Sequence, residues 1–380
     1  MKLPLGMCVL SFGLWLGCGD DDATTSDAGT DAVVEEDAGT DAGTDAGPPP
    51  PSIEFPAAGP ISGEAGRGSF TFGVATAAAQ IEDQNVDSDW YVWTQPEAEG
   101  GLGNGTFVGD AVRGFTEQVA DVDLVTATNL DAYRLNPSWS RIEPTRDAVS
   151  EAALAHYDEV VDALVTAGVK PMLTVHHFSS PQWIDDPRRT EDCTEDPSDT
   201  DLCGWHHPTG VDQIIEELAE YATTLAERYG DRVDEWCTLN EPINYLLASY
   251  GIGLFPPGRS LLVSRFDDFL EVVRNYVRAH VAVYEAIKAA DTIDADGDGI
   301  AAAVGYSLSV AEWLPSRSRR PSDDPDDIAA AALVQYVYHH VFTDALVEGG
   351  FDERVCEHVV VDVLDERGGG DVVGLSLLHI

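Results

Sequence analysis

The sequence predicts an α/β fold, and it favours an incomplete (β/α)8 barrel (TIM barrel) over a doubly wound sheet. Six apolar runs have the length and composition of strands: residues 69–76, 132–139, 170–178, 235–241, 301–313 and 372–379. Strands that are apolar along most of their length are typical of a parallel sheet covered by helices. Polar residues lie at or just after the ends of four runs: Gln80, Arg134, His176, His177, Asn240 and Glu241. A barrel spreads its functional residues over several strand ends in this way, whereas a doubly wound sheet usually collects them at one crevice.

Amphipathic helices are expected between the strands, at residues 151–167, 212–229, 266–290 and 327–348. In the first of them, Leu154, Tyr157, Val161 and Leu164 recur at the spacing that places them on one helical face. Gly168 follows directly, and glycine is the residue that most often ends a helix in the left-handed conformation. This alternation of strands and helices is what a barrel requires.

The first residues indicate export. Lys2 precedes an apolar stretch at residues 3–16, which is too short to span a bilayer as a stable helix and is followed by small residues. Cys18 resembles the lipid-accepting cysteine of bacterial lipoproteins, although Trp15 stands where such signals prefer leucine. We therefore expect residues 1–18 to be a signal peptide of lipoprotein type, which would leave the protein at the outer membrane or cell surface. Ordinary cleavage, with release into the periplasm or the medium, is the alternative.

Residues 19–62 are predicted to be a disordered acidic linker. Asp-Ala-Gly-Thr recurs in this segment, four prolines follow at residues 48–51, and no Lys or Arg occurs between Lys2 and Arg67. Such a composition buries too little apolar surface to offset the entropy of ordering. The remaining residues, 63–380, are expected to form the barrel domain.

The formal net charge of −47 argues against nucleic acid as a partner, because its phosphates would be repelled. The same charge argues against docking on anionic lipid, so contact with a membrane is expected only through a lipid on Cys18. No residue pattern implies a cofactor. A neutral sugar is a partner that an acidic surface does not hinder.

Two of the six cysteines are predicted to form a disulfide. Cys193 and Cys203 flank an acidic loop, and in an oxidising compartment they are plausible partners. Cys237 lies within an apolar strand and is expected to be a buried thiol. No cysteine spacing resembles a zinc site.

Five motifs follow one another in order along the predicted barrel. Thr238, Leu239, Asn240, Glu241 and Pro242 end an apolar run, so that a carboxylic acid stands at the mouth of the barrel. The other motifs lie within residues 72–82, 133–142, 171–183 and 255–258. Together they resemble the motifs of family-1 glycoside hydrolases, the β-glucosidase group, from about residue 70 onward. Taken alone, Asn-Glu-Pro after a strand is better explained as a helix-entry turn with Glu near the positive end of the helix dipole, and it is the four other motifs in order that favour the catalytic interpretation.

This resemblance implies hydrolysis of terminal β-O-glycosidic bonds by a retaining mechanism on a β-glucoside or β-linked oligosaccharide. Glu241 matches the family's acid/base, which delivers a proton to the departing oxygen as an oxocarbenium-like centre forms. The substrate-binding positions that the resemblance implies are Gln80, His177, Asn240, Arg134 and Trp313, with Arg134 supporting the nucleophilic carboxylate. In this reading Asn240 binds the sugar's 2-hydroxyl, and Gln80 and His177 bind the outer hydroxyls.

A second site candidate lies in the turn before the fifth predicted strand. Asp294, Asp296 and Asp298 alternate with small residues as at the start of a calcium loop, but Gly305 stands where the closing bidentate Glu belongs. We therefore keep a weak calcium candidate beside the simpler interpretation, a solvated acidic turn.

The family's pattern is only partly present. Residues 371–378 align with its sixth strand, with Ser376 and Leu377 where the family usually has Asn and Tyr. The seventh strand, which carries the nucleophilic Glu, and the eighth are not found. We therefore expect a truncated barrel with about six of eight strand–helix units, without its nucleophile. The alternative function is that of an inactive fragment or a carbohydrate-binding pseudoenzyme.

Overall fold

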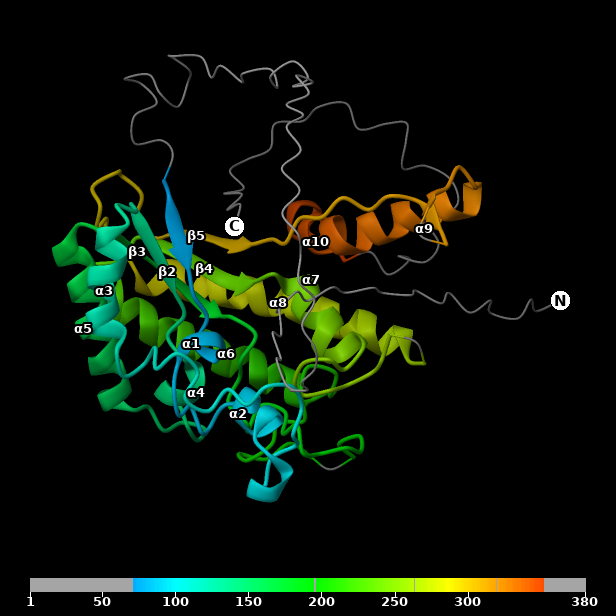
Figure 1. The fold of residues 1–380 in the computed structure, drawn as a ribbon, viewed down its shortest axis with the longest axis horizontal. Coiled ribbons are helices and arrows are strands. Elements are labelled where there is room, and N and C mark those ends of the chain that lie inside the picture. The colour runs from blue at the N-terminus through cyan, green and yellow to red at the C-terminus, as the bar shows by residue number, and fades with distance from the viewer. Residues whose placement is uncertain (1–70, 195, 263, 319, 352–380) are drawn as a thin grey trace, which may run out of the picture. The chain divides into compact units, whose positions relative to one another are not determined.

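A parallel sheet of five strands organises residues 71–351, which the structure, a computed structural model, describes apart from residues 195, 263 and 319. The strands are β1 (Gly73–Ala75), β2 (Ala132–Leu135), β3 (Lys170–His176), β4 (Glu235–Asn240) and β5 (Ala303–Ser307). They pair in sequence order, each parallel to the next (Figure 1). All their carboxyl ends therefore meet at one end of the sheet.

Four helices pack in succession along the sheet: α3 (Gln118–Ala127), α5 (Glu151–Ala167), α6 (Gly210–Tyr229) and α8 (Phe266–Ala290) (Figure 1). Helix α5 packs on β3, and α8 packs on β4 and β5. The other helical elements are α1 (Ala78–Ile81), α2 (Asp89–Thr94), η1 (Glu97–Glu99), α4 (Trp139–Ile142), α7 (Pro242–Leu246), η2 (Leu247–Gly251), α9 (Pro325–Gln335), η3 (Tyr336–His340) and α10 (Val341–Glu348). A two-stranded antiparallel pair, β6 (Ser316–Arg317) and β7 (Arg320–Pro321), precedes α9. Within the described residues, no helix is both long enough and apolar enough to cross a membrane.

Local capping explains why α5 has the predicted bounds. The Ser150 hydroxyl accepts a hydrogen bond from the Ala153 amide at 3.2 Å, which satisfies one of the free amides of the first turn. At the other end Gly168 has φ +74°, the left-handed conformation in which its amide bonds back to the last turn. Between these caps Leu154, Tyr157 and Leu164 are buried against the sheet and its neighbours.

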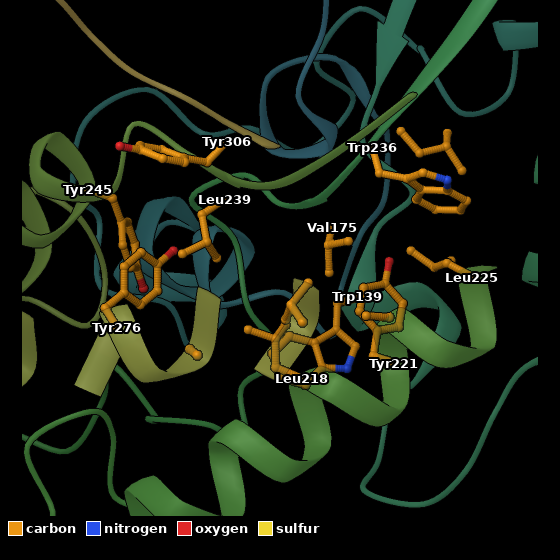
Figure 2. Packing of buried hydrophobic residues seen from close by; sticks show 14 of the residues in the cluster. Trp139, Val175, Leu218, Tyr221, Leu225, Trp236, Leu239, Tyr245, Tyr276 and Tyr306 are labelled. Atoms are coloured by element: carbon orange, nitrogen blue, oxygen red, sulfur yellow. The ribbon is translucent and has the colours of Figure 1, made fainter. Parts of the chain in front are cut away.

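The core lies between the sheet and these helices (Figure 2). Leu218, Tyr221 and Leu225 of α6 point toward the sheet, with Leu225 next to Trp236 of β4, and all four side chains are buried. Trp139 stacks on Tyr221, with ring centroids 5.5 Å apart and planes inclined by 16°. This layer anchors the strands from the helix side and leaves their opposite faces for the polar residues described below.

The structure corrects several predicted boundaries. The strand predicted at residues 301–313 is only Ala303–Ser307, and the one predicted at 132–139 ends at Leu135 because α4 begins at Trp139. The helix predicted at residues 327–348 starts at Pro325, where the Asp324 side chain accepts from the Asp326 amide, and runs through three consecutive helical segments. The first predicted strand shrinks to Gly73–Ala75. Signal peptide, linker, Cys18 and the strand expected at 372–379 lie outside the described residues.

A core substitution tests this packing. Leu239 of β4 is fully buried, so Leu239→Ala should lower the free energy of unfolding by about 2–5 kcal/mol through lost transfer energy and the cavity left behind. Equilibrium urea unfolding measures the change. The matched control is Leu124→Ala on α3, where the side chain is 66% exposed and the expected change is within about 0.5 kcal/mol. Equal effects at the two positions would contradict the placement of the core.

Candidate active site

A buried arginine joins three strands at the carboxyl end of the sheet. Arg134 of β2 donates from Nη1 and Nη2 to Asn240 Oδ1 of β4, each at 3.0 Å, and from Nη1 to Ser307 Oγ of β5 at 2.9 Å. Ser307 Oγ donates in turn to Asn240 Oδ1 at 2.7 Å. Each of the three residues is 2% exposed. A polar floor is thus built from side chains that are 67 to 173 positions apart in the sequence.

An irregularity in β4 turns Asn240 toward this floor. Cys237 pairs with Gly305 and Asn240 with Ser307, so β4 has one more residue than β5 between the two pairs. Without the extra residue, side chains three positions apart would point to opposite faces of the sheet. Because a bulge shifts this alternation, Cys237 and Asn240 both contact Arg134.

Glu241 follows directly and has an unusual backbone. Its φ of 44° and ψ of 60° are left-handed, a conformation that costs a non-glycine residue about 1–3 kcal/mol and occurs preferentially at functional sites. The Glu241 amide donates to the Ser307 carbonyl at 2.9 Å, and Asn244 Nδ2 donates to Glu241 Oε2 at 2.8 Å. The side chain is partly exposed. A carboxyl group held in this way beside a polar floor can exchange protons with a bound molecule.

His177 lies next to the same floor as a neutral base. It is 7% exposed, and its Nδ1 has no hydrogen-bond partner among the described residues. Burial, then the positive charge of Arg134 and the electrostatic repulsion that a second proton on the adjacent His176 ring would add, lower the pKa of His177 to about 3. His176 is structural by contrast, because its ring bonds the Tyr276 hydroxyl at 2.7 Å and the Ser180 hydroxyl at 3.1 Å. A buried ring nitrogen without a partner is a position where a ligand hydroxyl would be favoured.

The two remaining predicted sugar ligands are placed less directly. Gln80 lies on α1, just after β1, with an exposed side chain, and no described hydrogen bond joins it to Arg134, His177 or Glu241. Trp313 is half-buried, with its ring centroid 5.4 Å from that of Tyr338. Burial raises the pKa of Tyr338, and the nearby Glu241 carboxylate adds to this effect. Tyr338 therefore connects Trp313 to the surroundings of Glu241.

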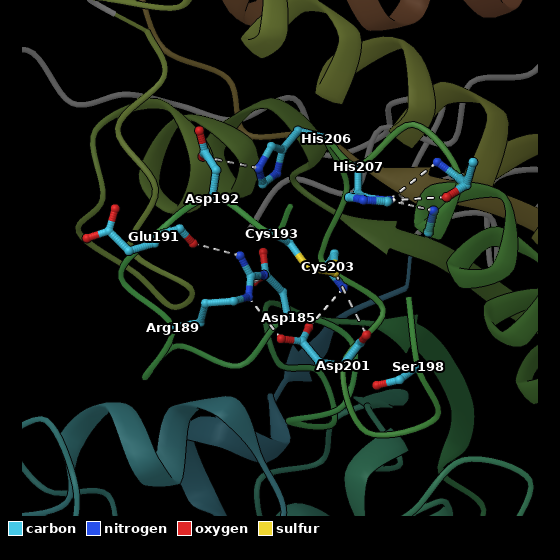
Figure 3. The surroundings of a disulfide bond; sticks show 12 residues. Asp185, Arg189, Glu191, Asp192, Cys193, Ser198, Asp201, Cys203, His206 and His207 are labelled. Carbon is cyan, nitrogen blue, oxygen red and sulfur yellow. Dashed lines mark hydrogen bonds and ion pairs between the residues drawn. A yellow bond between two sulfur atoms is a disulfide. The ribbon is translucent and has the colours of Figure 1, made fainter. Parts of the chain in front are cut away.

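The predicted cysteine pair forms a disulfide in the loop between β3 and α6 (Figure 3). Ion pairs hold both sides of this loop: Arg189 Nε lies 2.9 Å from Asp201 Oδ2, and Arg265 Nη1 lies 2.7 Å from Asp192 Oδ1. The Cys237 thiol is free and buried.

The predicted calcium residues lie near the amino-terminal ends of β3 and β4, away from Glu241. Carboxylate oxygens of Asp294, Asp296, Asp298 and Asp234 lie within 4.8 Å of one another. Lys170 Nζ lies 2.7 Å from Asp296 Oδ2, so the lysine ammonium group already offsets part of the negative charge of this cluster. Calcium binding here stays a prediction.

Comparison with known proteins agrees with this arrangement. The family model described as "Glycosyl hydrolase family 1" matches residues 64–363, most of the chain. The chain belongs to glycosyl hydrolase family 1. The family predicted from the five motifs is therefore confirmed.

Relatives of this family-1 chain include a beta-glucosidase 1B of Phanerodontia chrysosporium, 34% identical over 200 residues that cover 50% of the chain and 33% of the relative. Beta-glucosidase 6 of Oryza sativa subsp. japonica is 28% identical over 81% of the chain and 57% of its own length. The chain thus spans between a third and three fifths of these two relatives.

Solved structures show the same fold. A beta-glycosidase from Pyrococcus horikoshii matches with a TM-score of 0.58 at 27% identity, over 73% of the chain and 55% of that protein. A psychrophilic beta-glucosidase from Micrococcus antarcticus matches with a TM-score of 0.59 at 27% identity, over 76% and 54%. The predicted TIM-barrel class is confirmed, and the five described strands form part of such a barrel.

Sequence reasoning missed two residues of the family-1 chain's site. Ser307 completes the polar floor; it is the last residue of β5 but lies in the middle of the longer strand predicted at residues 301–313, so the sequence did not mark it as a strand end. Tyr338 lies on η3, distant in sequence from every motif, and no pattern in the sequence pointed to it.

The neutral His177 makes a pH-dependent prediction. Its folded pKa of about 3 lies below the ordinary 6.5, so its contribution to stability is present above pH 6.5 and is lost as the pH falls toward 3. His177→Gln should therefore reduce the acid-side loss of stability between pH 6 and pH 4, by up to about 1.4 kcal/mol per pH unit. Urea unfolding at each pH measures this. Exposed His340→Gln is the control, and an unchanged acid profile for His177→Gln would contradict the assignment.

Proposed function

We propose that the chain carries the acid/base half of a retaining β-glucosidase-like site, which hydrolyses terminal β-O-glycosidic bonds of β-glucosides or β-linked oligosaccharides. The observation that carries this proposal is the buried Arg134 guanidinium, which is bonded to Asn240, the residue before Glu241. Its described partners, Asn240, Ser307 and Cys237, are all neutral, and its Nε has none within the described residues.

A buried charge with only neutral partners calls for an anion. A retaining glycosidase needs a second carboxyl group about 5 Å from its acid/base, and a carboxylate there would meet the Arg134 charge. Among the described residues Arg134 has no ion pair with a carboxylate, and its hydrogen-bond partners there are Asn240, Ser307 and Cys237. In this proposal the nucleophile is therefore supplied from outside the described residues.

The hydrogen bonds also orient the remaining groups. Asn240 Oδ1 accepts from Arg134 and Ser307, which leaves the Nδ2 amino group to donate to a sugar hydroxyl. The neutral His177 ring can donate or accept at another hydroxyl. Glu241 delivers its proton to the glycosidic oxygen as that bond lengthens, with Gln80 and Trp313 proposed at the periphery of the sugar. The same polar groups that select a sugar thus surround the proton donor.

A second candidate is carbohydrate binding without turnover. It is favoured by the one observation that no described carboxylate pairs with Arg134. Two measurements in solution distinguish these functions. A carbohydrate-binding protein without turnover binds glucose in a calorimetric titration but releases no aglycone from any β-glucoside.

Substitution of Glu241 tests the hydrolase. Glu241→Gln should lower kcat/KM of the full chain on an alkyl β-glucoside by roughly 10²–10⁴, because a positioned proton donor contributes about that much. The loss should be smaller on a nitrophenyl β-glucoside, whose leaving group needs little protonation. Exposed Glu312→Gln is the matched control and should retain activity.

Three outcomes are distinct. Equal losses on both substrates would remove Glu241 from the acid role. Turnover that survives Glu241→Gln on the alkyl substrate would refute the site. Absence of turnover in the unsubstituted chain, with glucose binding that His177→Ala abolishes, would establish the second candidate.

We also propose export with a lipid anchor at Cys18. The apolar stretch at residues 3–16 and the cysteine after it support this, and a disulfide between Cys193 and Cys203 suits an oxidising compartment. Cys18→Ser should move the protein from the membrane pellet to the soluble exported fraction in a bacterial host that processes lipoproteins. A pellet fraction unchanged by the substitution would contradict the anchor.

A further inference from the structure

One side-chain hydrogen bond holds the Glu241 carboxyl group. Asn244 Nδ2 donates to Glu241 Oε2 at 2.8 Å, and among the described residues this is the one hydrogen bond of the group, so Oε1 has no partner there. Both residues are partly exposed, which leaves the carboxyl group open to a bound molecule. The two oxygens therefore differ, because Oε2 is occupied by the asparagine and Oε1 is available to a ligand.

The contact is not helix capping. Glu241 occupies the position before the first helical residue of α7, where a side chain normally accepts from the backbone amide of the second or third helical residue. Glu241 makes no such bond and accepts instead from the side chain of the third residue, Asn244. The pairing of these two side chains thus calls for a reason other than the stability of the helix.

The backbone of α7 fixes the position of Asn244. Its neighbours in the chain, Ile243 and Tyr245, are 2% and 1% exposed. The Tyr245 ring stacks on Phe178, with ring centroids 5.7 Å apart and planes inclined by 14°. The Tyr245 amide donates to the Glu241 carbonyl at 3.0 Å, which joins the helix to the left-handed residue before it. The amide group of Asn244 is therefore presented to the carboxyl group from an anchored turn.

The chemistry of the two groups decides where a proton can sit. A side-chain NH2 group donates hydrogen bonds and cannot accept them, so Oε2 is the acceptor whether Glu241 is neutral or ionised. Because the carbonyl oxygen of a neutral carboxyl group accepts better than its hydroxyl oxygen, Oε2 is then the carbonyl and Oε1 carries the proton. A hydrogen bond to a carboxylate is roughly twice as strong as one to a neutral acceptor, so the bond from Asn244 strengthens as the proton leaves.

We propose that Asn244 is a positioning residue for Glu241, which holds Oε2 as an acceptor and so makes Oε1 the atom that transfers the proton. The proposal rests on the proposed function in one respect, the role of Glu241 as proton donor. In that step the Oε1–H bond breaks and the proton joins the glycosidic oxygen. This oxygen keeps the electron pair of its bond to the anomeric carbon and leaves as an alcohol, while the nucleophilic carboxylate bonds that carbon. The charge left on Glu241 is the one that Asn244 stabilises.

Leaving-group dependence tests this role in the full chain. Asn244→Leu should lower kcat/KM on an alkyl β-glucoside by roughly 5- to 30-fold, the difference between a hydrogen bond to a charged and to a neutral acceptor. It should leave a nitrophenyl β-glucoside nearly unaffected, because that leaving group needs little protonation. Asn244→Gln keeps the NH2 donor and is the matched variant that should recover most of the loss. Equal losses on both substrates would overturn the proposal, because a merely structural residue acts in that way.

Crystal structures of the full chain test the positioning without turnover. The Glu241 carboxyl group should show one orientation in the unsubstituted protein, with Oε2 bonded to Asn244 Nδ2, and should turn away or adopt several orientations in Asn244→Leu. The same single orientation in both proteins would overturn the proposal. If Asn244→Leu does not fold, the unsubstituted structure decides, since a Glu241 carboxyl group bonded elsewhere overturns it. Absence of turnover in the unsubstituted chain would count against the hydrolase alone, because the structures still test the positioning.

Discussion

The hydrogen bonds of Arg134 are the interaction on which the rest of the site depends. They connect the ends of β2, β4 and β5 through Asn240 and Ser307 and set the position from which Glu241 leaves the sheet. Burying a guanidinium this deeply costs free energy of desolvation, unless its N–H groups are hydrogen-bonded and an anion pairs with its charge. The described residues accept hydrogen bonds from both terminal nitrogens of Arg134, but none of them supplies a negative charge to pair with the guanidinium. An anion bound here would supply that charge, which makes this location a candidate for chemistry that uses a carboxylate.

Several local conformations around Arg134 are unfavourable on their own and share one end of the sheet. They include the bulge in β4, the left-handed Glu241 and the left-handed Phe178. Buried neutral histidines add to this cost, because burial lowers the pKa of His176 to about 3 as well. Strained backbone and unpaired polar groups persist only where tight packing of the surrounding core holds the residues in place. The packed layer of α5, α6 and α8 supplies that rigidity.

Much of the fold could be predicted because its signals are local. Helix α8 has the predicted bounds of 266–290, and α5 has its predicted bounds because Ser150 and Gly168 cap it. Arg134 of β2 and Asn240 of β4 were both expected at the mouth of the barrel, since the carboxyl ends of parallel barrel strands meet at one face, and the structure brings them together across β3.

What the sequence could not show depends on contacts between distant segments. The bulge that reorients Asn240 is set by pairing with β5, and the left-handed Phe178 is set by α2. Likewise, the sequence presents Asp89 as an ordinary acid in the first turn of a helix. Only the structure shows that it is buried and that the Ser180 amide, distant in the sequence, donates to its carboxyl group. The predicted element boundaries were wrong where a capping residue, and not the hydrophobic pattern, determines the end of a helix. An example is α9, which begins at Pro325 because Asp324 caps it.

The central claim is that a sugar binds on the Arg134–Asn240–Ser307 floor with Glu241 at its glycosidic oxygen. A crystal structure of the full chain with bound glucose tests this most directly. The account predicts the pyranose above Asn240, its anomeric oxygen within hydrogen-bonding distance of the Glu241 carboxyl, and another hydroxyl at His177. A sugar bound elsewhere, or a Glu241 side chain turned away from it, would contradict the account.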